Sequence, residues 1–227
     1  PPHHRPLRST APAAEPPSIR AAKENPVTHL AFGGASIDGG LYTRITWLAR
    51  HTPHELNTLI TYATDYGLAL FAFLMLTGWW RARTRDSGTM ATALATPVVV
   101  VTAFLVNDLA KSLFGEPRPC RTLHAVTIEV CPGPGDWSFP SNHSALVAAA
   151  AVALLLCDRQ LGRIAVPAAL LMAASRVWVG AHYPHDVAAG LIVGALVARG
   201  LTPLARRAAP AVDRIRATRL RPLVAAR

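Results

Sequence analysis

Three short clusters of polar residues interrupt an otherwise apolar stretch in the second half of the chain. Together they supply cations, histidines, a carboxylate, a hydroxyl and an amide: Lys111, Arg118, Ser141, Asn142, His143, Arg176, His182 and Asp186. A phosphoryl group in transfer spreads negative charge over its oxygens, and cations and hydrogen-bond donors stabilise that charge. We therefore predict that the three clusters converge on one phosphate group.

The cluster Pro140-Ser141-Asn142-His143 directly precedes an apolar segment, so Ser141 and Asn142 are expected at a helix N-terminus. Free backbone N–H groups and the helix dipole favour an anion there. The Ser141 hydroxyl adds a donor, and His143 in the first turn points toward the same place. Alone, this cluster would be no more than a helix cap.

The third cluster suggests a catalytic pair. Pro184 suits the first turn of a helix, which places Asp186 in that turn, where it can reach back toward His182. A carboxylate bonded to one imidazole nitrogen fixes the tautomer and leaves the other nitrogen as a nucleophile or base. Arg176 stands at the end of the preceding apolar segment, and ionisable groups at such depth are usually functional.

The first cluster combines Lys111 with Arg118, which two flanking prolines hold in a non-helical segment. Cys120 and Cys131 follow in the same loop and are candidates for a disulfide outside the cytoplasm, with two free thiols as the alternative. No paired Cys/His spacing indicates a metal site.

The composition indicates a membrane protein, because 51% of the 227 residues are hydrophobic and only 16% are charged. The expected fold is an all-α helical bundle with about five transmembrane helices and an N-terminal interfacial helix. The expected spans are 56–80, 89–109, 145–157, 164–179 and 187–204. The net charge of +10 fits anionic lipid, and no recognition motif supports nucleic acid as a partner.

Four regions are expected along the chain. Residues 1–27 are a disordered tail, 28–51 an interfacial segment, 52–205 the membrane core and 206–227 a basic cytoplasmic tail. Basic residues gather in the turns at 81–85 and 158–163 and in the tail, so the positive-inside rule places the three clusters on the extracytoplasmic side.

The order and spacing of the clusters resemble a known signature. Lys111-x6-Arg118-Pro119, Pro140-Ser141-Asn142-His143 and Ser175-Arg176-x5-His182-x3-Asp186 resemble the three motifs of the type 2 phosphatidic acid phosphatase superfamily. The one departure is Asn142, where the family usually has glycine, and this change is expected to alter head-group preference. The short layout is most similar to bacterial undecaprenyl diphosphate phosphatases.

The resemblance implies a metal-independent lipid phosphatase without a cofactor. His182 would attack phosphorus and form a phosphohistidine, Asp186 would orient it, and His143 would protonate the leaving group. Lys111, Arg118, Ser141, Asn142 and Arg176 would hold the phosphate. Alternative substrates are phosphatidate, phosphatidylglycerophosphate and a polyprenyl-phosphoribose, and a protein that only binds or transports lipid phosphates is the alternative of a different class.

Two further polar residues are expected to play no part in the chemistry. We expect His185 to lie at the rim and Glu116 to be solvated. The partners that the sequence indicates are the bilayer and a membrane lipid, and nothing in it indicates an oligomeric state.

Overall fold

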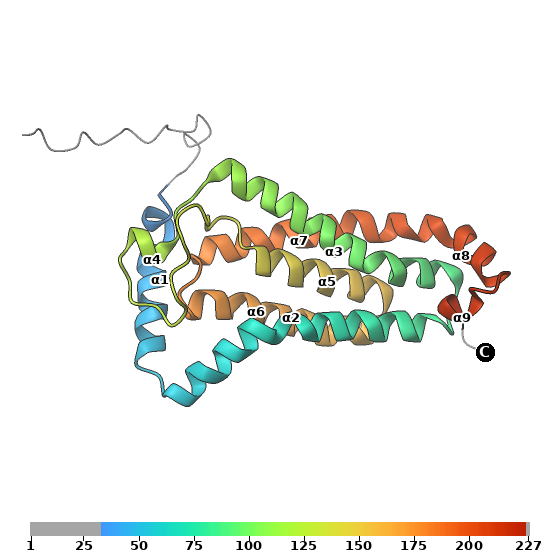
Figure 1. Ribbon diagram of the computed structural model, residues 1–227, viewed down its shortest axis with the longest axis horizontal. Helices are drawn as coiled ribbons and strands as arrows, with labels where there is room; N and C mark the ends of the chain where they lie inside the picture. The colour runs from blue at the N-terminus through green and yellow to red at the C-terminus, as the bar shows by residue number, and fades with distance from the viewer. Residues whose placement is uncertain (1–32, 226–227) are drawn as a thin grey trace, which may run out of the picture.

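The computed structural model describes residues 33–225, and every regular element in that range is helical (Figure 1). The expected disordered tail, residues 1–27, lies outside the described residues. The elements are α1 (Ala35–Arg50), α2 (His54–Ala82), α3 (Ser87–Phe114), α4 (Pro119–Thr122), α5 (Asn142–Cys157), α6 (Arg159–Trp178), α7 (Pro184–Ala205), a 3-10 turn (Arg206–Ala208), α8 (Ala209–Arg216) and α9 (Arg221–Val224).

Five apolar helices lie where the sequence predicts spans, and four of them are long and apolar enough to cross a bilayer. The fifth, α5, has 16 residues and would extend only about 24 Å. This helix lies in the middle of the bundle, where α2, α3, α6 and α7 all contact it (Figure 1). Alanine forms much of its buried surface, which lets the neighbouring helices approach closely.

Helix α1 crosses the end of the bundle at a steep angle to the other helices (Figure 1). Its outer surface carries large apolar side chains, since Leu41, Trp47 and Leu48 are each about half exposed. Its inner surface carries Tyr42, which is fully buried against α7. A helix is therefore present where the sequence predicts one, and its position at the membrane interface stays a prediction.

Two glycines of α7 bring the second and third polar clusters together. A Cβ atom at Gly190 would lie 2.4 Å from the Ser141 carbonyl oxygen, and one at Gly194 would lie 2.1 Å from that of Ala145. Only glycine permits helices α5 and α7 to pack this closely. The backbone N–H of Ser141 consequently donates a hydrogen bond to the Asp186 carbonyl oxygen (3.0 Å).

The basic C-terminal region is folded against the far end of the bundle (Figure 1). Arg216 donates hydrogen bonds to the Arg85 carbonyl oxygen (2.9 Å) and to the Ser87 hydroxyl (2.8 Å). The Trp79 indole N–H donates to the Leu223 carbonyl oxygen (3.0 Å). The α2–α3 turn and the C-terminal residues therefore form one basic surface at the end opposite α1.

We expect Gly194→Ala to destabilise the protein by about 1–3 kcal/mol, because the added methyl group meets backbone that cannot move independently. Gly200→Ala is the matched control in the same helix, since a Cβ there meets nothing within 4 Å. Gly200→Ala should raise the free energy of unfolding by about 0.5–1 kcal/mol, because alanine has the higher helix propensity. Thermal unfolding of both variants in detergent measures the difference, and equal midpoints would contradict the close packing.

Candidate active site

A buried histidine and a buried aspartate form the centre of the site. His182 lies in the turn between α6 and α7 and is 2% exposed, and Asp186 in the first turn of α7 is fully buried. The His182 Nδ1 atom is 3.3 Å from Asp186 Oδ2. The same oxygen accepts hydrogen bonds from the Tyr183 backbone N–H (2.8 Å) and the Ser138 hydroxyl. The carboxylate therefore favours the tautomer in which Nδ1 carries the proton.

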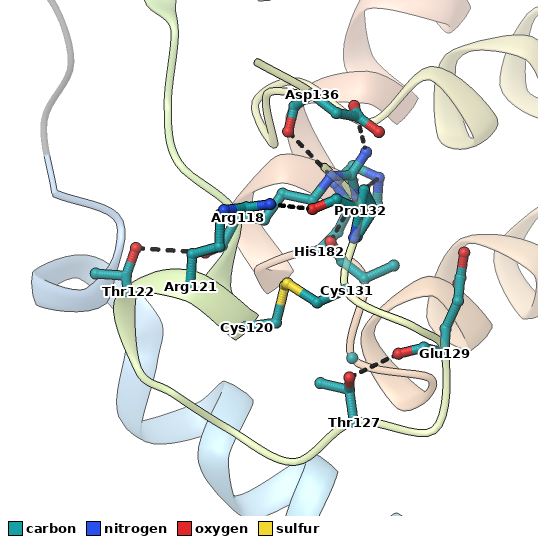
Figure 2. Close-up of a disulfide and its surroundings, with 12 residues drawn as sticks. Arg118, Cys120, Arg121, Thr122, Thr127, Glu129, Cys131, Pro132, Asp136 and His182 are labelled. Atoms are coloured by element: carbon teal, nitrogen blue, oxygen red, sulfur yellow. Dashed lines mark hydrogen bonds and ion pairs between the residues drawn. A yellow bond between two sulfur atoms is a disulfide. The ribbon is translucent and has the colours of Figure 1, made fainter. Parts of the chain in front are cut away.

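The other ring nitrogen of His182 faces Arg118. Arg118 Nη1 lies 3.4 Å from His182 Nε2 and donates to the Ala181 carbonyl oxygen (2.8 Å). Asp136 holds the opposite end of the guanidinium group, with Nη2 and Oδ1 2.9 Å apart (Figure 2). An arginine so placed leaves Nε2 unprotonated and sets a fixed positive charge beside it.

Arg176 is also buried and paired with an acidic residue. Its Nη2 atom is 2.9 Å from Glu129 Oε2, and its Nη1 atom donates to the Thr64 hydroxyl (3.2 Å). Glu129 lies in the loop between α4 and α5, where its N–H donates to the Val179 carbonyl oxygen (3.1 Å). Both arginines thus meet a carboxylate from the same loop.

Lys111 occupies the last turn of α3 and is 8% exposed. It lines an open polar pocket of about 480 Å³, together with Asp108, Ser112, Asp136, Trp137 and Asn142. The pocket lining therefore combines an ammonium group, two carboxylates and uncharged side chains that form hydrogen bonds.

The second cluster begins α5, as predicted. Ser141 is the N-cap, and its side chain accepts a hydrogen bond from the Ser144 N–H (3.5 Å). The Asn142 side chain turns to α3, where its Oδ1 accepts from Asn107 (2.6 Å) and its Nδ2 donates to Asp108 (3.2 Å). His143 follows in the first turn and is partly buried.

The electrostatics of His182 show that all three clusters act on it. Burial is the largest cause that lowers the pKa of His182 well below its usual value, followed by Arg118, Lys111, Arg176 and His143. For Asp136, burial opposes ionisation, but the hydrogen bond and charge of Arg118 bring its pKa below the usual value. Burial and the neighbouring cations therefore favour the neutral imidazole of His182.

A disulfide between Cys120 and Cys131 fixes the loop that carries these acids (Figure 2). The two Cα atoms are 6.0 Å apart, within the usual range. The bridge joins α4, directly after Arg118, to the segment between Glu129 and Asp136. Closing this short loop is worth on the order of 2–3 kcal/mol.

Three residues around the His182–Asp186 pair depart from the expectations or were missed. Glu116, expected to be solvated, is 2% exposed because it packs beneath Gly34 and beside His185. His185, expected at the rim, is partly buried between Glu116 and Asp38. Ser138 was not anticipated, and no pattern connects a lone serine to an aspartate 48 positions away.

One group of side chains has the geometry to hold a metal ion. Ligand atoms of Glu116, His185 and Asp186 all lie within 4.8 Å of one another. The same distances also describe hydrogen-bonded ion pairs, since His185 Nε2 lies 3.2 Å from Glu116 Oε2 and 3.3 Å from Asp186 Oδ1.

Comparison with known proteins identifies the family. The model of the PAP2 superfamily matches residues 89–209, which contain all three clusters. The chain belongs to the PAP2 superfamily. It is 29% identical over 159 residues to the undecaprenyl-diphosphatase BcrC of Bacillus subtilis, covering 69% of this chain and 78% of the relative. It is 30% identical over 148 residues to an undecaprenyl-diphosphatase of Sulfolobus acidocaldarius, covering 63% and 67%.

A shorter alignment connects the chain to a second type of relative. A decaprenylphosphoryl-5-phosphoribose phosphatase of Mycobacterium tuberculosis is 41% identical over 97 residues, which are 42% of this chain and 51% of the relative. Among solved structures, the phosphatidylglycerolphosphate phosphatase of Bacillus subtilis is 22% identical, with a TM-score of 0.48, covering 78% of this chain and 90% of that one.

The lowered pKa of His182 predicts how stability depends on pH. Below an ordinary pKa of 6.5 the unfolded chain binds a proton at this residue and the folded protein does not, so stability is lost as the pH falls. Between pH 7 and pH 5, wild type should lose up to about 2 kcal/mol more than His182→Asn. Thermal unfolding across that range measures this, and parallel curves would show that His182 is protonated in the folded protein.

Proposed function

We propose that this PAP2 lipid phosphatase removes the terminal phosphate of an isoprenoid diphosphate, undecaprenyl diphosphate, through a phosphohistidine on His182. The observation that carries the proposal is the two-sided setting of that imidazole: Asp186 binds Nδ1, while Nε2 faces Arg118. Such an arrangement supplies a nucleophile next to the charge that a phosphoryl group requires.

The reaction divides between the two histidines. His182 Nε2 forms a bond to phosphorus while the bond from phosphorus to the bridging oxygen breaks, and the imidazolium of His143 donates its proton to that oxygen. Water then attacks the phosphohistidine, and neutral His143 takes the proton from it, so that inorganic phosphate leaves and His182 is regenerated. Arg118, Lys111, Arg176 and the N–H groups at the start of α5 would hold the phosphate oxygens.

An apolar groove between α2 and α6 supports an isoprenoid chain as the lipid part. It has a volume of about 440 Å³ and is lined by, among others, Ile60, Gly67, Leu70, Leu171 and Met172. Ser175 forms part of its wall and shares a hydrogen bond with Thr64 (2.7 Å). Thr64 in turn accepts from Arg176 (3.2 Å), so two hydrogen bonds connect the groove to the phosphate site.

The open polar pocket supports a second candidate substrate. Asp108 and Asp136 place carboxylates beside Lys111, and carboxylates bind sugar hydroxyl groups while repelling a second phosphate. A polyprenyl-phosphoribose would place its ribose there. The groups that read the transferred phosphate are the same for both substrates.

We also propose that the site faces the extracytoplasmic side. The turn at 81–85, the α5–α6 turn and the C-terminal helices lie at the end opposite α1 and the catalytic loop (Figure 1). These are the arginine-rich segments, which the positive-inside rule places in the cytoplasm. Cys120 and Cys131 then lie in an oxidising compartment, in keeping with their disulfide.

A panel of lipids tests the reaction. Phosphate release in detergent should be fastest with undecaprenyl diphosphate, slower with a polyprenyl-phosphoribose 5-phosphate, phosphatidylglycerophosphate and phosphatidate, and unchanged by EDTA. His182→Ala should reduce the rate about 10³-fold or more, because it removes the nucleophile. Full activity of His182→Ala would exclude the phosphohistidine intermediate. Loss of wild-type activity on chelation would contradict a metal-free reaction. A different order of rates among the lipids would change the proposed substrate.

The groove is tested by filling it. Ala174→Trp should raise KM for undecaprenyl diphosphate about tenfold with kcat nearly unchanged, because the indole occupies space proposed for the chain. Geranyl diphosphate should be much less affected. Ala69→Trp is the matched control, an exposed position of α2 outside the groove lining. Equal KM values for the two variants would exclude the groove as the chain site.

A further inference from the structure

We propose that Asp38, His185 and Glu116 form a clamp that holds Asp186 in place, so that docking of helix α1 sets the orientation of the catalytic pair. His185 would thus be a positioning residue, not a catalytic one. The proposal rests on the proposed role of His182 and Asp186, and it adds a role for the N-terminal helix.

His185 makes its polar contacts with three carboxylates. Its Nδ1 atom lies 2.9 Å from Asp38 Oδ1, and its backbone N–H donates to Asp38 Oδ2 (2.7 Å). Its Nε2 atom lies 3.2 Å from Glu116 Oε2 and 3.3 Å from Asp186 Oδ1. These acids come from α1, from the segment after α3 and from α7, so His185 joins three elements at one point.

Hydrogen-bond accounting fixes the state of this ring. Both of its nitrogens face carboxylate oxygens, and ionised carboxylates only accept hydrogen bonds. Donation from both nitrogens satisfies these oxygens, and the ring is then an imidazolium. A ring in this state has no lone pair for attack on phosphorus, so His185 is not a second nucleophile.

The two oxygens of Asp186 are divided between the two histidines. Oδ2 accepts hydrogen bonds from the Ser138 hydroxyl and the Tyr183 N–H, and it faces His182 Nδ1. Oδ1 accepts no hydrogen bond among residues 33–225. The ion pair with His185 is the contact on that side. A carboxylate that is fully buried needs such compensation to stay ionised and oriented.

Aromatic stacking and α1 fix the clamp from outside. The His185 ring stacks between Tyr183 and Phe139, with centroids 5.3 and 5.7 Å away. Tyr42 of α1 packs on Tyr183 (5.5 Å) and donates to the Gly180 carbonyl oxygen (2.9 Å). Helix α1 therefore contacts the catalytic turn at Gly180, just before His182, and at His185, just after it.

A role in positioning predicts loss of kcat with little change in KM, because Asp186 acts on the nucleophile and not on the phosphate. His185→Phe keeps the stacked ring but removes both donors, and it should lower kcat about 100-fold. His185→Gln keeps one donor and should recover to within about tenfold of wild type. Asp38→Asn should lower kcat about tenfold, while Glu55→Gln, an exposed acid in the first turn of α2, should leave it unchanged.

The pH profile separates positioning from simple folding. Loss of the positive charge beside Asp186 favours its protonated form, so the acid limb of the kcat profile should move to higher pH in His185→Phe and less in His185→Gln. Within residues 33–225, the titratable groups facing His185 include Asp38 from α1, Glu116, and Asp186 and Tyr183 from its own segment. The assay uses full-length protein and whichever lipid wild type hydrolyses fastest, so a wrong lipid assignment does not affect the ratio of variant to wild type.

Three results would overturn the proposal. One is a His185→Phe variant with wild-type kcat. Another is a loss of activity that follows only the fraction of unfolded protein in a thermal melt, with an unmoved pH profile. The third is loss of wild-type activity on EDTA treatment that Zn²⁺ restores, because that would make Glu116, His185 and Asp186 a metal site.

Discussion

The site depends on keeping one carboxylate ionised where water cannot reach it. Asp186 is fully buried, and an isolated charge there would cost several kcal/mol. The structure meets this cost with a helix N-terminus, the Tyr183 N–H, the Ser138 hydroxyl and two histidines. The close approach of α5 and α7 at Gly190 follows from the same need, since it brings the start of α5 onto the Asp186 backbone.

The cations around His182 are already balanced before a substrate binds. Asp136 pairs with Arg118 and Glu129 pairs with Arg176, and both acids come from the loop that the Cys120–Cys131 disulfide constrains. These carboxylates contact the guanidinium groups through the same donors that a phosphate would use. On the proposed function, substrate binding would be an exchange of anions, in which the phosphate would take the place of Asp136 on Arg118 and of Glu129 on Arg176.

The sequence was sufficient for the helices and for the family, because both depend on local patterns. Apolar runs located α2, α3, α5, α6 and α7, and the spacing of three motifs identified the family. The residues that support Asp186 were not accessible in this way. Asp38 and His185 are 147 positions apart, and Ser138 and Asp186 are 48 apart. Glu116 was expected in solvent because its burial is created by Gly34 and His185, which only the folded chain brings to it.

Asn142 stands where the family usually has glycine, and it does more than add an amide group to the pocket. Its side chain is already engaged, accepting from Asn107 and donating to Asp108 at 3.2 Å. Both polar atoms of the Asn142 side chain therefore have hydrogen-bond partners in α3, so this side chain is not free to bind a head group. What it does is fix the Asp108 carboxylate at the edge of the pocket that Lys111 lines. A glycine at this position would remove the hydrogen bond to Asp108, so on the proposed function Asn142 would influence substrate choice through the position of that carboxylate.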